Sequence, residues 1–598
     1  MGRISMERAG RPVVAIAIVA GLAVMPSAAR AMPDEPPAPA GDTCLSIVER
    51  IEAEIGQDHG VYRPRRSPGQ GMRPGGAVGA IGDALTGAAP PLAPPPAVME
   101  AMPAPSVAPP APDPNGGSVP TLYPPDVERD RFPDVAPNGV VRVADQPVST
   151  LSADVDTASM GVVRRFLRDG VRPPSDAVRV EEMVNYFDYA YPRPRTAAEP
   201  FAPSVNVMPS PWGAGREVMV VGVRGWSPDR SRRPDANIVL LADVSGSMRG
   251  PDRLGLVKRS MALLVDQLEG RDVVSLVIYA GADRVVLEPT PADDKRTICT
   301  ALGHLASGGG TAGSKGIATA YDLAERSFRR GGINRVILAT DGDFNLGVVD
   351  DGRLEDVVAR KRETGVYLSI LGVGRGNYND RTMQRLAQAG NGMAAYLDSL
   401  AEGRRVLVEK LDAQLQPIAD DVKVQVEFNP ARVAEYRLVG YETRLLREED
   451  FANDAVDAGE IGDGHTVTAI YEIAAPGSAG LRLPARRYGD TGSVAPAAGR
   501  EAEIAHLRIR WKAPGETASR LMERPVTEAD RAPLARQDDD TRFAVAVAGL
   551  AQILRGDPSV GDLGLGDVLD LATGAIGDDP HGHRRAFVDL VTQAMALR

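Results

Sequence analysis

The sequence predicts an α/β protein with a doubly wound, mostly parallel sheet, a flanking β-rich, sandwich-like region, C-terminal helices and a disordered proline-rich N-terminal tether. Three observations support this prediction. Short apolar runs alternate with helical patterns between residues 236 and 413. Strand-like segments follow one another after residue 416, and helical patterns return from about residue 540. Fourteen prolines lie between Pro90 and Pro125.

The composition is that of a globular protein, with 43% hydrophobic and 25% charged residues among 598. These values exclude a polytopic membrane protein and a wholly disordered chain. The formal net charge of -12 disfavours nucleic-acid binding, because phosphate binding needs concentrated positive charge. Two cysteines, Cys44 and Cys299, are too few for a disulfide scaffold or a cysteine-based structural zinc site.

Residues 1–31 have the order of a secretory signal peptide. Arginines precede the apolar run from Val13 to Met25, and Ala29 to Ala31 offer small residues for cleavage. The apolar run is short for a membrane span, which needs about 20 residues. We therefore expect an exported protein, periplasmic or at the cell surface, that is attached to a membrane only if this segment is not cleaved.

Residues 32–120 are rich in Pro, Ala and Gly, and we predict a disordered linker, because such a stretch cannot bury enough apolar surface to offset its chain entropy. One short helix is compatible with the apolar spacing from Leu45 to Ile55, with Thr43 near its start. Because Cys44 lies in this tether and Cys299 on an expected helix, we expect unpaired cysteines, although an oxidising compartment would permit a disulfide.

Residues 236–413 alternate strands and helices, and several of the expected strands are continuous apolar runs, as is typical of strands covered on both faces. The expected strands are NIVLLAD, DVVSLVIYA, RVVLEP, RVILATD, VYLSILGVG and MAAYLD, and the expected helices are Leu254–Leu268, Gly316–Phe328, Leu354–Glu363, Arg381–Ala389 and a closing helix Leu400–Leu415. This alternation predicts an open parallel sheet whose ligands bind at the carboxyl ends of the strands.

Two regions flank this part of the chain. An N-terminal flanking region, residues 139–230, contains helical spacing and then strand-like alternation at residues 205–226. A C-terminal flanking domain, residues 416–598, contains strands that suit an antiparallel sandwich or sheet, followed by helices. The expected helices of the two regions are Thr157–Leu167, Val178–Phe187, Thr541–Leu554, Leu563–Ala572 and Arg584–Leu597.

Oxygen-bearing side chains gather at three strand or loop ends of the α/β region. The first strand ends in Asp243, followed by Ser245 and Ser247, a glycine-rich loop leads to Thr311, and a later strand ends in Asp341. These side chains are hard oxygen ligands, which suit Mg²⁺, Ca²⁺ or Mn²⁺ rather than a soft metal. The sequence therefore predicts a divalent-cation site at this edge of the sheet.

This order of residues resembles the metal-ion-dependent adhesion site of the von Willebrand factor type A (VWA) domain, and all five positions match. The resemblance implies that the two serines and the threonine can contact the metal directly. It also implies that the two aspartates often act through water and that a carboxylate of a partner completes the shell. Further segments, among them PVSTLSADVDTASMGVVRRFL, NRVILATDGDFNLGV and DAGEIGDGHTVTAIYEI, are similar to a bacterial subgroup, the YfbK-like VWA proteins, over residues 139–598.

Other candidate residues have simpler explanations. Asp154 and Asp156 have the spacing of a phosphatase D-x-D motif, but a helix cap near Thr157 is the favoured interpretation. His581 and His583 could bind zinc weakly, but we expect a solvated loop. The Asp243 and Ser245 pair could also be ordinary turn and cap residues. Asp343 could assist the metal, but capping or the support of a metal ligand is the favoured interpretation.

We expect a binding protein of adhesion or scaffold type and not an enzyme. With Asp243 and Asp341 ionised, two negative charges balance a divalent ion, and neutral hydroxyl ligands leave the ion able to attract a further carboxylate. The expected cofactor is Mg²⁺, with Mn²⁺ or Ca²⁺ as alternatives, and the expected partner is a protein that offers an acidic side chain. The alternatives are a metal-assisted hydrolase, for which the sequence identifies no general base, and a purely structural assembly protein.

Overall fold

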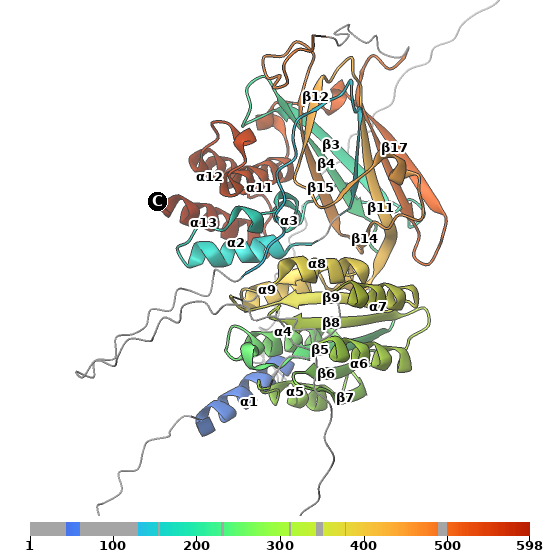
Figure 1. The fold of residues 1–598 in the computed structure, drawn as a ribbon, viewed down its shortest axis with the longest axis vertical. Helices are drawn as coiled ribbons and strands as arrows, with labels where there is room; N and C mark the ends of the chain where they lie inside the picture. Colours follow the sequence, from blue (N-terminus) through green and yellow to red (C-terminus); the bar gives the residue numbers. More distant parts are fainter. Residues whose placement is uncertain are drawn as a thin grey trace, which may run out of the picture. The chain divides into compact units, whose positions relative to one another are not determined.

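The computed structural model describes residues 43–59, 130–153, 156–228, 233–309, 313–342, 351–376, 378–487 and 499–597. The expected signal peptide, most of the expected linker, and residues Asp154, Thr311 and Asp343 lie outside these ranges. The described residues all belong to a single compact unit, residues 43–598 (Figure 1). None of their helices is both long and apolar enough to cross a bilayer.

The α/β domain is built on a six-stranded sheet. Its strands, in spatial order, are β10 Ala394–Tyr396, β9 Tyr367–Gly372, β8 Ile333–Thr340, β5 Ala236–Asp243, β6 Val273–Tyr279 and β7 Asp283–Pro291. All neighbours are parallel except β7, which pairs antiparallel with β6 at one edge. Every residue of β5 and β8 is buried, because helices cover both faces. The predicted doubly wound, mostly parallel sheet is confirmed.

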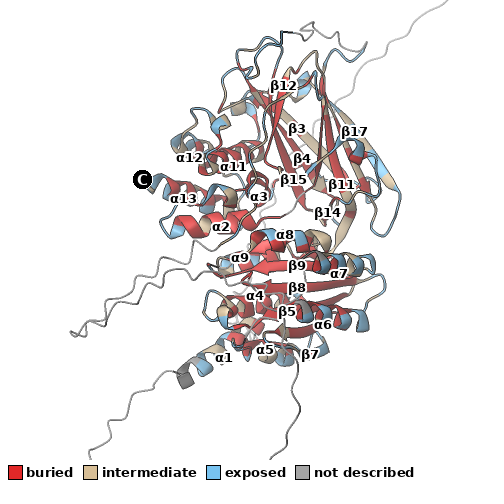
Figure 2. Ribbon diagram, in the orientation of Figure 1, coloured by how far each residue is buried: buried red, intermediate tan, exposed pale blue. Residues whose placement is uncertain are grey.

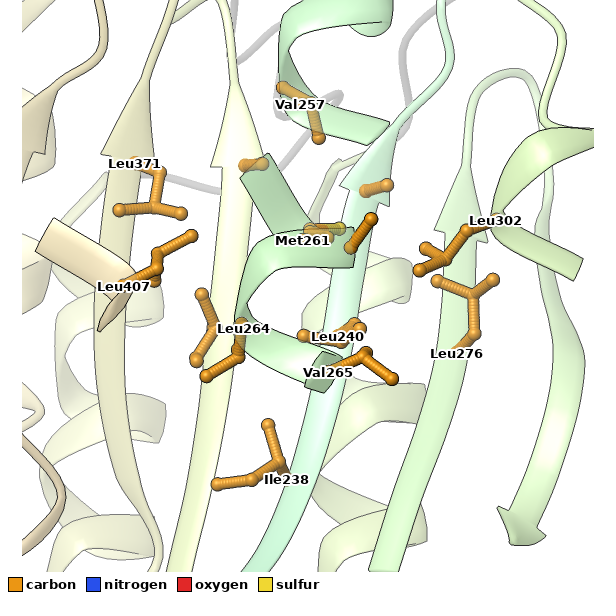
Figure 3. Packing of buried hydrophobic residues seen from close by; sticks show 14 of the residues in the cluster. Ile238, Leu240, Val257, Met261, Leu264, Val265, Leu276, Leu302, Leu371 and Leu407 are labelled. Carbon is orange, nitrogen blue, oxygen red and sulfur yellow. The ribbon is translucent and has the colours of Figure 1, made fainter. Parts of the chain in front are cut away.

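Each face of this sheet has its own layer of helices. One face is covered by α1 Cys44–His59, α4 Leu254–Gln267 and α5 Lys295–Gly303, and the other by α6 Gly313–Arg326, α7 Asp351–Glu363 and α8 Asp380–Ala389. Figure 3 shows Leu240 of β5 packed beside Met261 and Val265 of α4. Each such buried side chain contributes about 1.5–3 kcal/mol to folding through the removal of apolar surface from water.

Two antiparallel sheets form a sandwich beside the α/β domain. The first contains β1 Val141–Arg142, β12 Glu435–Val439, β15 Thr466–Ala474, β4 Glu217–Gly225 and β3 Phe201–Pro209, in that spatial order. The second contains β13 Leu445–Leu446, β2 Val148–Ser152, β11 Pro417–Phe428, β16 Glu503–Lys512 and β17 Ser519–Thr527, with β14 Gly459–Gly462 paired to β11. Buried side chains from both sheets, such as Val205, Phe428 and Tyr471, form the core between them (Figure 2).

The two flanking regions are one body rather than two. Strands β1 to β4 come from the N-terminal flank, yet β2 pairs with β11 and β4 pairs with β15 of the C-terminal flank. The α/β domain is therefore inserted between β4 and β11, whose adjoining ends meet where Gly225 contacts Ile418. The sequence analysis treated residues 139–230 and 416–598 as two separate flanking regions. It missed their pairing, because alternation of apolar and polar residues identifies a strand but not the strand with which it pairs.

Five helices cover the outer face of the first sandwich sheet. They are α2 Ala158–Arg168, α3 Val180–Asn185, α11 Asp539–Arg555, α12 Leu565–Thr573 and α13 His583–Ala596. Their buried residues share one cluster with Val218, Val220 and Ile470 of the sheet. Helix α2 also packs on the α/β domain, because Ala158, Val162 and Phe166 belong to the core that contains Tyr396 of β10.

The expected closing helix Leu400–Leu415 is interrupted. The structure contains α9 Leu400–Arg404, a π-helical turn Arg405–Glu409, and α10 Leu411–Leu415. In this turn Arg405 is buried and donates to Thr157 Oγ1 at 2.8 Å. Apolar periodicity could not predict this interruption, because one extra residue in a turn changes the pattern too little over so short a segment.

Residues 44–59 form helix α1, so the expectations of a disordered linker at these residues and of unpaired cysteines were wrong. Cys44 forms a disulfide with Cys299 of α5, with a Cα–Cα distance of 5.2 Å. The backbone N–H of Cys44 donates to Asp266 at 2.7 Å, and Glu52 pairs with Lys258 at 3.2 Å. The prediction of a helix after Thr43 is confirmed, but the helix is fixed to the domain because its apolar stripe is buried there.

Candidate metal centre

Asp243 lies at the carboxyl end of β5, where the buried strand delivers its carboxylate to the edge of the sheet. The residue is fully buried. Its Oδ1 accepts a hydrogen bond from the backbone N–H of Ser245 at 2.8 Å, and its Oδ2 accepts one from Thr340 Oγ1 at 3.2 Å. One donor in the turn after β5 and one on the adjacent strand β8 therefore fix the orientation of this carboxylate.

The two serines lie together in the turn that follows β5. The Oγ atoms of Ser245 and Ser247 are 3.0 Å apart, and a short 3₁₀ turn, Gly246–Met248, holds them in this arrangement. Ser245 is buried, whereas Ser247 is partly exposed. Two hydroxyl oxygens at this separation can both contact one cation, and one of them faces solvent.

Asp341 follows β8, the strand next to β5, and is almost completely buried. Gly342 comes next with φ +86°, a conformation that side chains disfavour, and its N–H donates to Thr340 Oγ1 at 3.1 Å. Burial, together with the nearby charge of Asp341, raises the pKa of Asp243 to about 6. A cation bound beside these two buried carboxylates would stabilise their negative charges.

The glycine-rich loop lies against this turn. Gly246 N–H donates to the Gly309 carbonyl at 3.1 Å, and Gly308 N–H donates to the Val244 carbonyl at 2.7 Å. These two bonds join the loop to the residues that follow β5. The loop leads to Thr311, which lies outside the described residues, so four of the five predicted ligands are placed and they are brought to one edge.

Arg253, just before α4, is a residue at this edge that the sequence interpretation missed. Its guanidinium donates to the carbonyl of Ser247 and, at 2.7 Å, to that of Arg375, and it lies 4.0 Å from Asp341 Oδ2. Gly374 leaves room for it, since a Cβ there would lie 2.7 Å from Arg253 Nε. Arg253 thus links the serine turn to the loop after β9. No sequence signal marks it, because an arginine near a helix start is ordinary.

The donor set is that of a hard cation. Among the residues that the structure describes, no group of three or more His, Cys, Asp or Glu side chains could hold a metal. The site instead combines two carboxylates with serine hydroxyls, and Thr311 is the remaining expected hydroxyl. These oxygens suit Mg²⁺, Mn²⁺ or Ca²⁺ and do not suit a soft metal.

The other candidate residues have structural partners. Asp156 accepts from Ala394 N–H at 2.8 Å and pairs with Arg444 at 2.5 Å, so the D-x-D interpretation has no support here. Thr157 is the N-cap residue of α2, as expected, but its side chain makes no capping hydrogen bond.

The two histidines are not simply part of a solvated loop. His583 Nε2 lies 2.7 Å from Glu409, and His581 Nδ1 lies 3.6 Å from it. Glu409 comes from the π-helical turn of the α/β domain, which the sequence did not associate with the histidines.

Comparison with known proteins identifies the family. The model of the von Willebrand factor type A domain matches residues 237–409, the model "Uncharacterized protein YfbK, C-terminal" matches residues 413–597, and a model described as von Willebrand factor matches residues 126–220. The Escherichia coli (strain K12) protein "Uncharacterized protein YfbK" is 40% identical over 470 residues, which are 78% of this chain and 81% of that relative. The chain belongs to the YfbK family of VWA proteins.

Other similar proteins are more distant in sequence. "Uncharacterized protein sll0103" from Synechocystis sp. is 26% identical over 182 residues, which are 30% of this chain and 42% of that relative. Among solved structures, the von Willebrand factor type A protein from Catenulispora acidiphila is 18% identical and has a TM-score of 0.38, with 67% of this chain and 91% of that chain covered. VWA domains generally serve protein interaction or adhesion, and this YfbK-family chain carries such a domain.

Proposed function

We propose that this YfbK-family protein is an exported, divalent-cation-dependent binding protein, not an enzyme, whose VWA domain captures an acidic side chain of a protein partner. The observation that supports this function is the pair of buried carboxylates, Asp243 and Asp341, beside two serine hydroxyls at the carboxyl edge of the sheet. A bound cation would supply a coordination position and positive charge for the partner's carboxylate.

The residues of the chain divide this work between them. Asp243 and Asp341 supply the negative charge that attracts the cation, and Thr340 and Ser245 orient Asp243. The hydroxyls of Ser245, Ser247 and Thr311 would add neutral ligands. Because Ser247 is partly exposed, the site is open toward solvent on the side where a partner would approach.

The partner's carboxylate should be essential for binding. Replacement of the partner's Glu by Gln, or Asp by Asn, should weaken the complex about ten- to hundredfold, because a charge-assisted contact of about 1.5–3 kcal/mol is lost. Thr311→Ala and chelator should weaken the same complex. The measurement is capture of partner proteins by the mature chain in Mg²⁺, release by chelator, and titration of the purified partner.

If the partner binds as tightly in the presence of chelator, and as tightly to Thr311→Ala, as it binds the wild type in Mg²⁺, the complex forms through another surface. This result would contradict the proposal. Metal-dependent turnover in a hydrolase panel, lost in Asp243→Ala, would instead support the alternative of a metal-assisted hydrolase.

Export is the other part of the proposal. The disulfide between Cys44 and Cys299 supports it, because disulfides persist mainly in oxidising compartments. We expect removal of the N-terminal segment near Ala31, and mass spectrometry of the protein from its native host should show the mature start. A cytoplasmic protein that retains Met1 would contradict this prediction.

A further inference from the structure

A pocket of about 390 Å³ lies where the VWA domain meets the flanking helices. Its wall combines α9 and the following π-helical turn with α2 and with the start of α13, three segments that are far apart in the sequence (Figure 1). We call it the junction pocket. Its volume is within the range of about 300–1,000 Å³ that is usual for small-molecule sites, and it is separate from the metal centre.

One side of the junction pocket is apolar. Phe187, Phe587 and Leu590 line it and are almost fully buried, and the rings of Phe187 and Phe587 pack edge to face with centroids 5.6 Å apart. Met160 and Leu400 extend this surface. The aromatic pair is fixed by its own packing, so the pocket presents a preformed apolar wall.

The polar floor of the pocket is internally satisfied. Glu402 accepts hydrogen bonds from Arg164 at 2.7 Å, from Tyr186 Oη at 2.8 Å and from Arg405 at 2.9 Å. Burial by itself would raise the pKa of Glu402, but Arg405 and Arg164 lower it to about 2. This network holds the floor in place and keeps its charges paired, so a ligand would find its charged contact elsewhere.

The rim of the pocket carries the uncompensated charge. Three arginines and two histidines line the pocket, against two glutamates. Arg168 is paired with Asp398 at 2.6 Å, and the histidines face Glu409. Arg404 is exposed, and no residue in the described part of the chain forms an ion pair with it. Arg164 is also paired, with Asp398 and Glu402, so Arg404 is the lining arginine whose charge is free to attract an anionic ligand.

We propose that the junction pocket binds a small carboxylate with an aliphatic or aromatic body. The body would lie against Phe187 and Phe587, and the carboxylate would lie at the rim by Arg404. Arginine suits this role, because its planar fork matches a carboxylate with two parallel hydrogen bonds. Burial of the apolar body supplies affinity, and the charge selects the head group.

Occupancy of the pocket would couple the VWA domain to its flanks. A ligand there would contact α9 of the VWA domain, α2 of the N-terminal flank and α13 of the C-terminal flank at once. Because a ligand stabilises the state to which it binds, it should favour the arrangement in which these three segments are docked. This proposal does not depend on the metal centre and can be tested in the presence of chelator.

Calorimetric titration of the full mature chain with octanoate, octan-1-ol and acetate tests the proposal. Octanoate should bind at least tenfold more tightly than octan-1-ol, which lacks the charge, and than acetate, which lacks the apolar body. Arg404→Gln should weaken octanoate about tenfold and leave octan-1-ol unchanged. Arg381→Gln, an exposed arginine on α8 outside the pocket, is the matched control and should change neither.

A second variant fills the pocket instead of changing its charge. Ala586 lines the pocket from the exposed side of α13, so Ala586→Trp should abolish binding of octanoate while the melting temperature changes little. The proposal is overturned if octanoate does not bind, if octan-1-ol binds as tightly, or if octanoate binds the Ala586→Trp and Arg404→Gln proteins as it binds the wild type.

Discussion

Addition of Mg²⁺ or Mn²⁺ should raise the melting temperature of the wild-type protein, and Asp243→Ala should lose at least a hundredfold in metal affinity. A ligand that binds the native state at 100 times its Kd adds about 2.7 kcal/mol to the free energy of unfolding. Asp243 carries one of the two buried negative charges and is oriented by Ser245 and Thr340, so its removal takes both charge and geometry from the site. Thermal melts with increasing metal measure the effect.

The control for this experiment is another buried carboxylate of the same sheet. Asp272 is fully buried and precedes β6 at the opposite end of the strands, where it pairs with Arg233 at 2.5 Å. Asp272→Asn should lower the melting temperature without metal, yet leave the increase caused by Mg²⁺ unchanged. If metal raises the melting temperature of Asp243→Ala as much as that of the wild type, Asp243 is not a ligand of the metal site.

Loss of the disulfide should release helix α1. A disulfide typically contributes about 2–4 kcal/mol, and Cys44 is the first residue of α1, so its bond to Cys299 keeps the whole helix close to α4 and α5. If tryptic cleavage at Arg50 reports local opening, Cys44→Ala should speed this cleavage on the order of 30- to 700-fold. Time courses of cleavage, followed by intact mass, measure the change.

Reduction of the wild type should have the same effect as the substitution, and reductant should not accelerate cleavage of the Cys44→Ala protein any further. Cys299→Ala should behave as Cys44→Ala does. If both variants resist trypsin as well as the oxidised wild type, the apolar contacts of Ile47 and Val48 and the ion pairs of Glu52 are enough to hold α1, and the disulfide is not the main attachment.

Local patterns predicted the parts of this protein that depend on local physics. The parallel sheet could be inferred because strands covered on both faces, such as β5 and β8, are continuous apolar runs. The positions of Asp243, Ser245, Ser247 and Asp341 followed from the same alternation, since carboxyl ends of parallel strands lie at one edge. The described residues of the site agree with that inference.

Features that depend on contacts between distant residues were not predictable in this way. The proximity of Cys44 to Cys299 results from the docking of α1, and nothing in the surrounding proline-rich sequence indicates where α1 will dock. Arg253 and Glu409 owe their roles to carbonyls and histidines on other elements. Residue type and spacing do not indicate which distant residues become neighbours in the fold, so these contacts could not be predicted from the sequence.

The insertion of the VWA domain between β4 and β11 has a consequence for the order of folding. During synthesis or export from the N-terminus, β2 cannot pair with β11, its neighbour in the sheet, until the whole VWA domain has emerged. The VWA sheet draws all its strands from the continuous segment 236–396, so it can form while the sandwich is incomplete. Until then β2 and β4 lack their partners β11 and β15, and their unpaired edges are prone to aggregation, because such long-range contacts close slowly. Chaperone dependence should therefore be concentrated in residues 141–225, which contain β1 to β4.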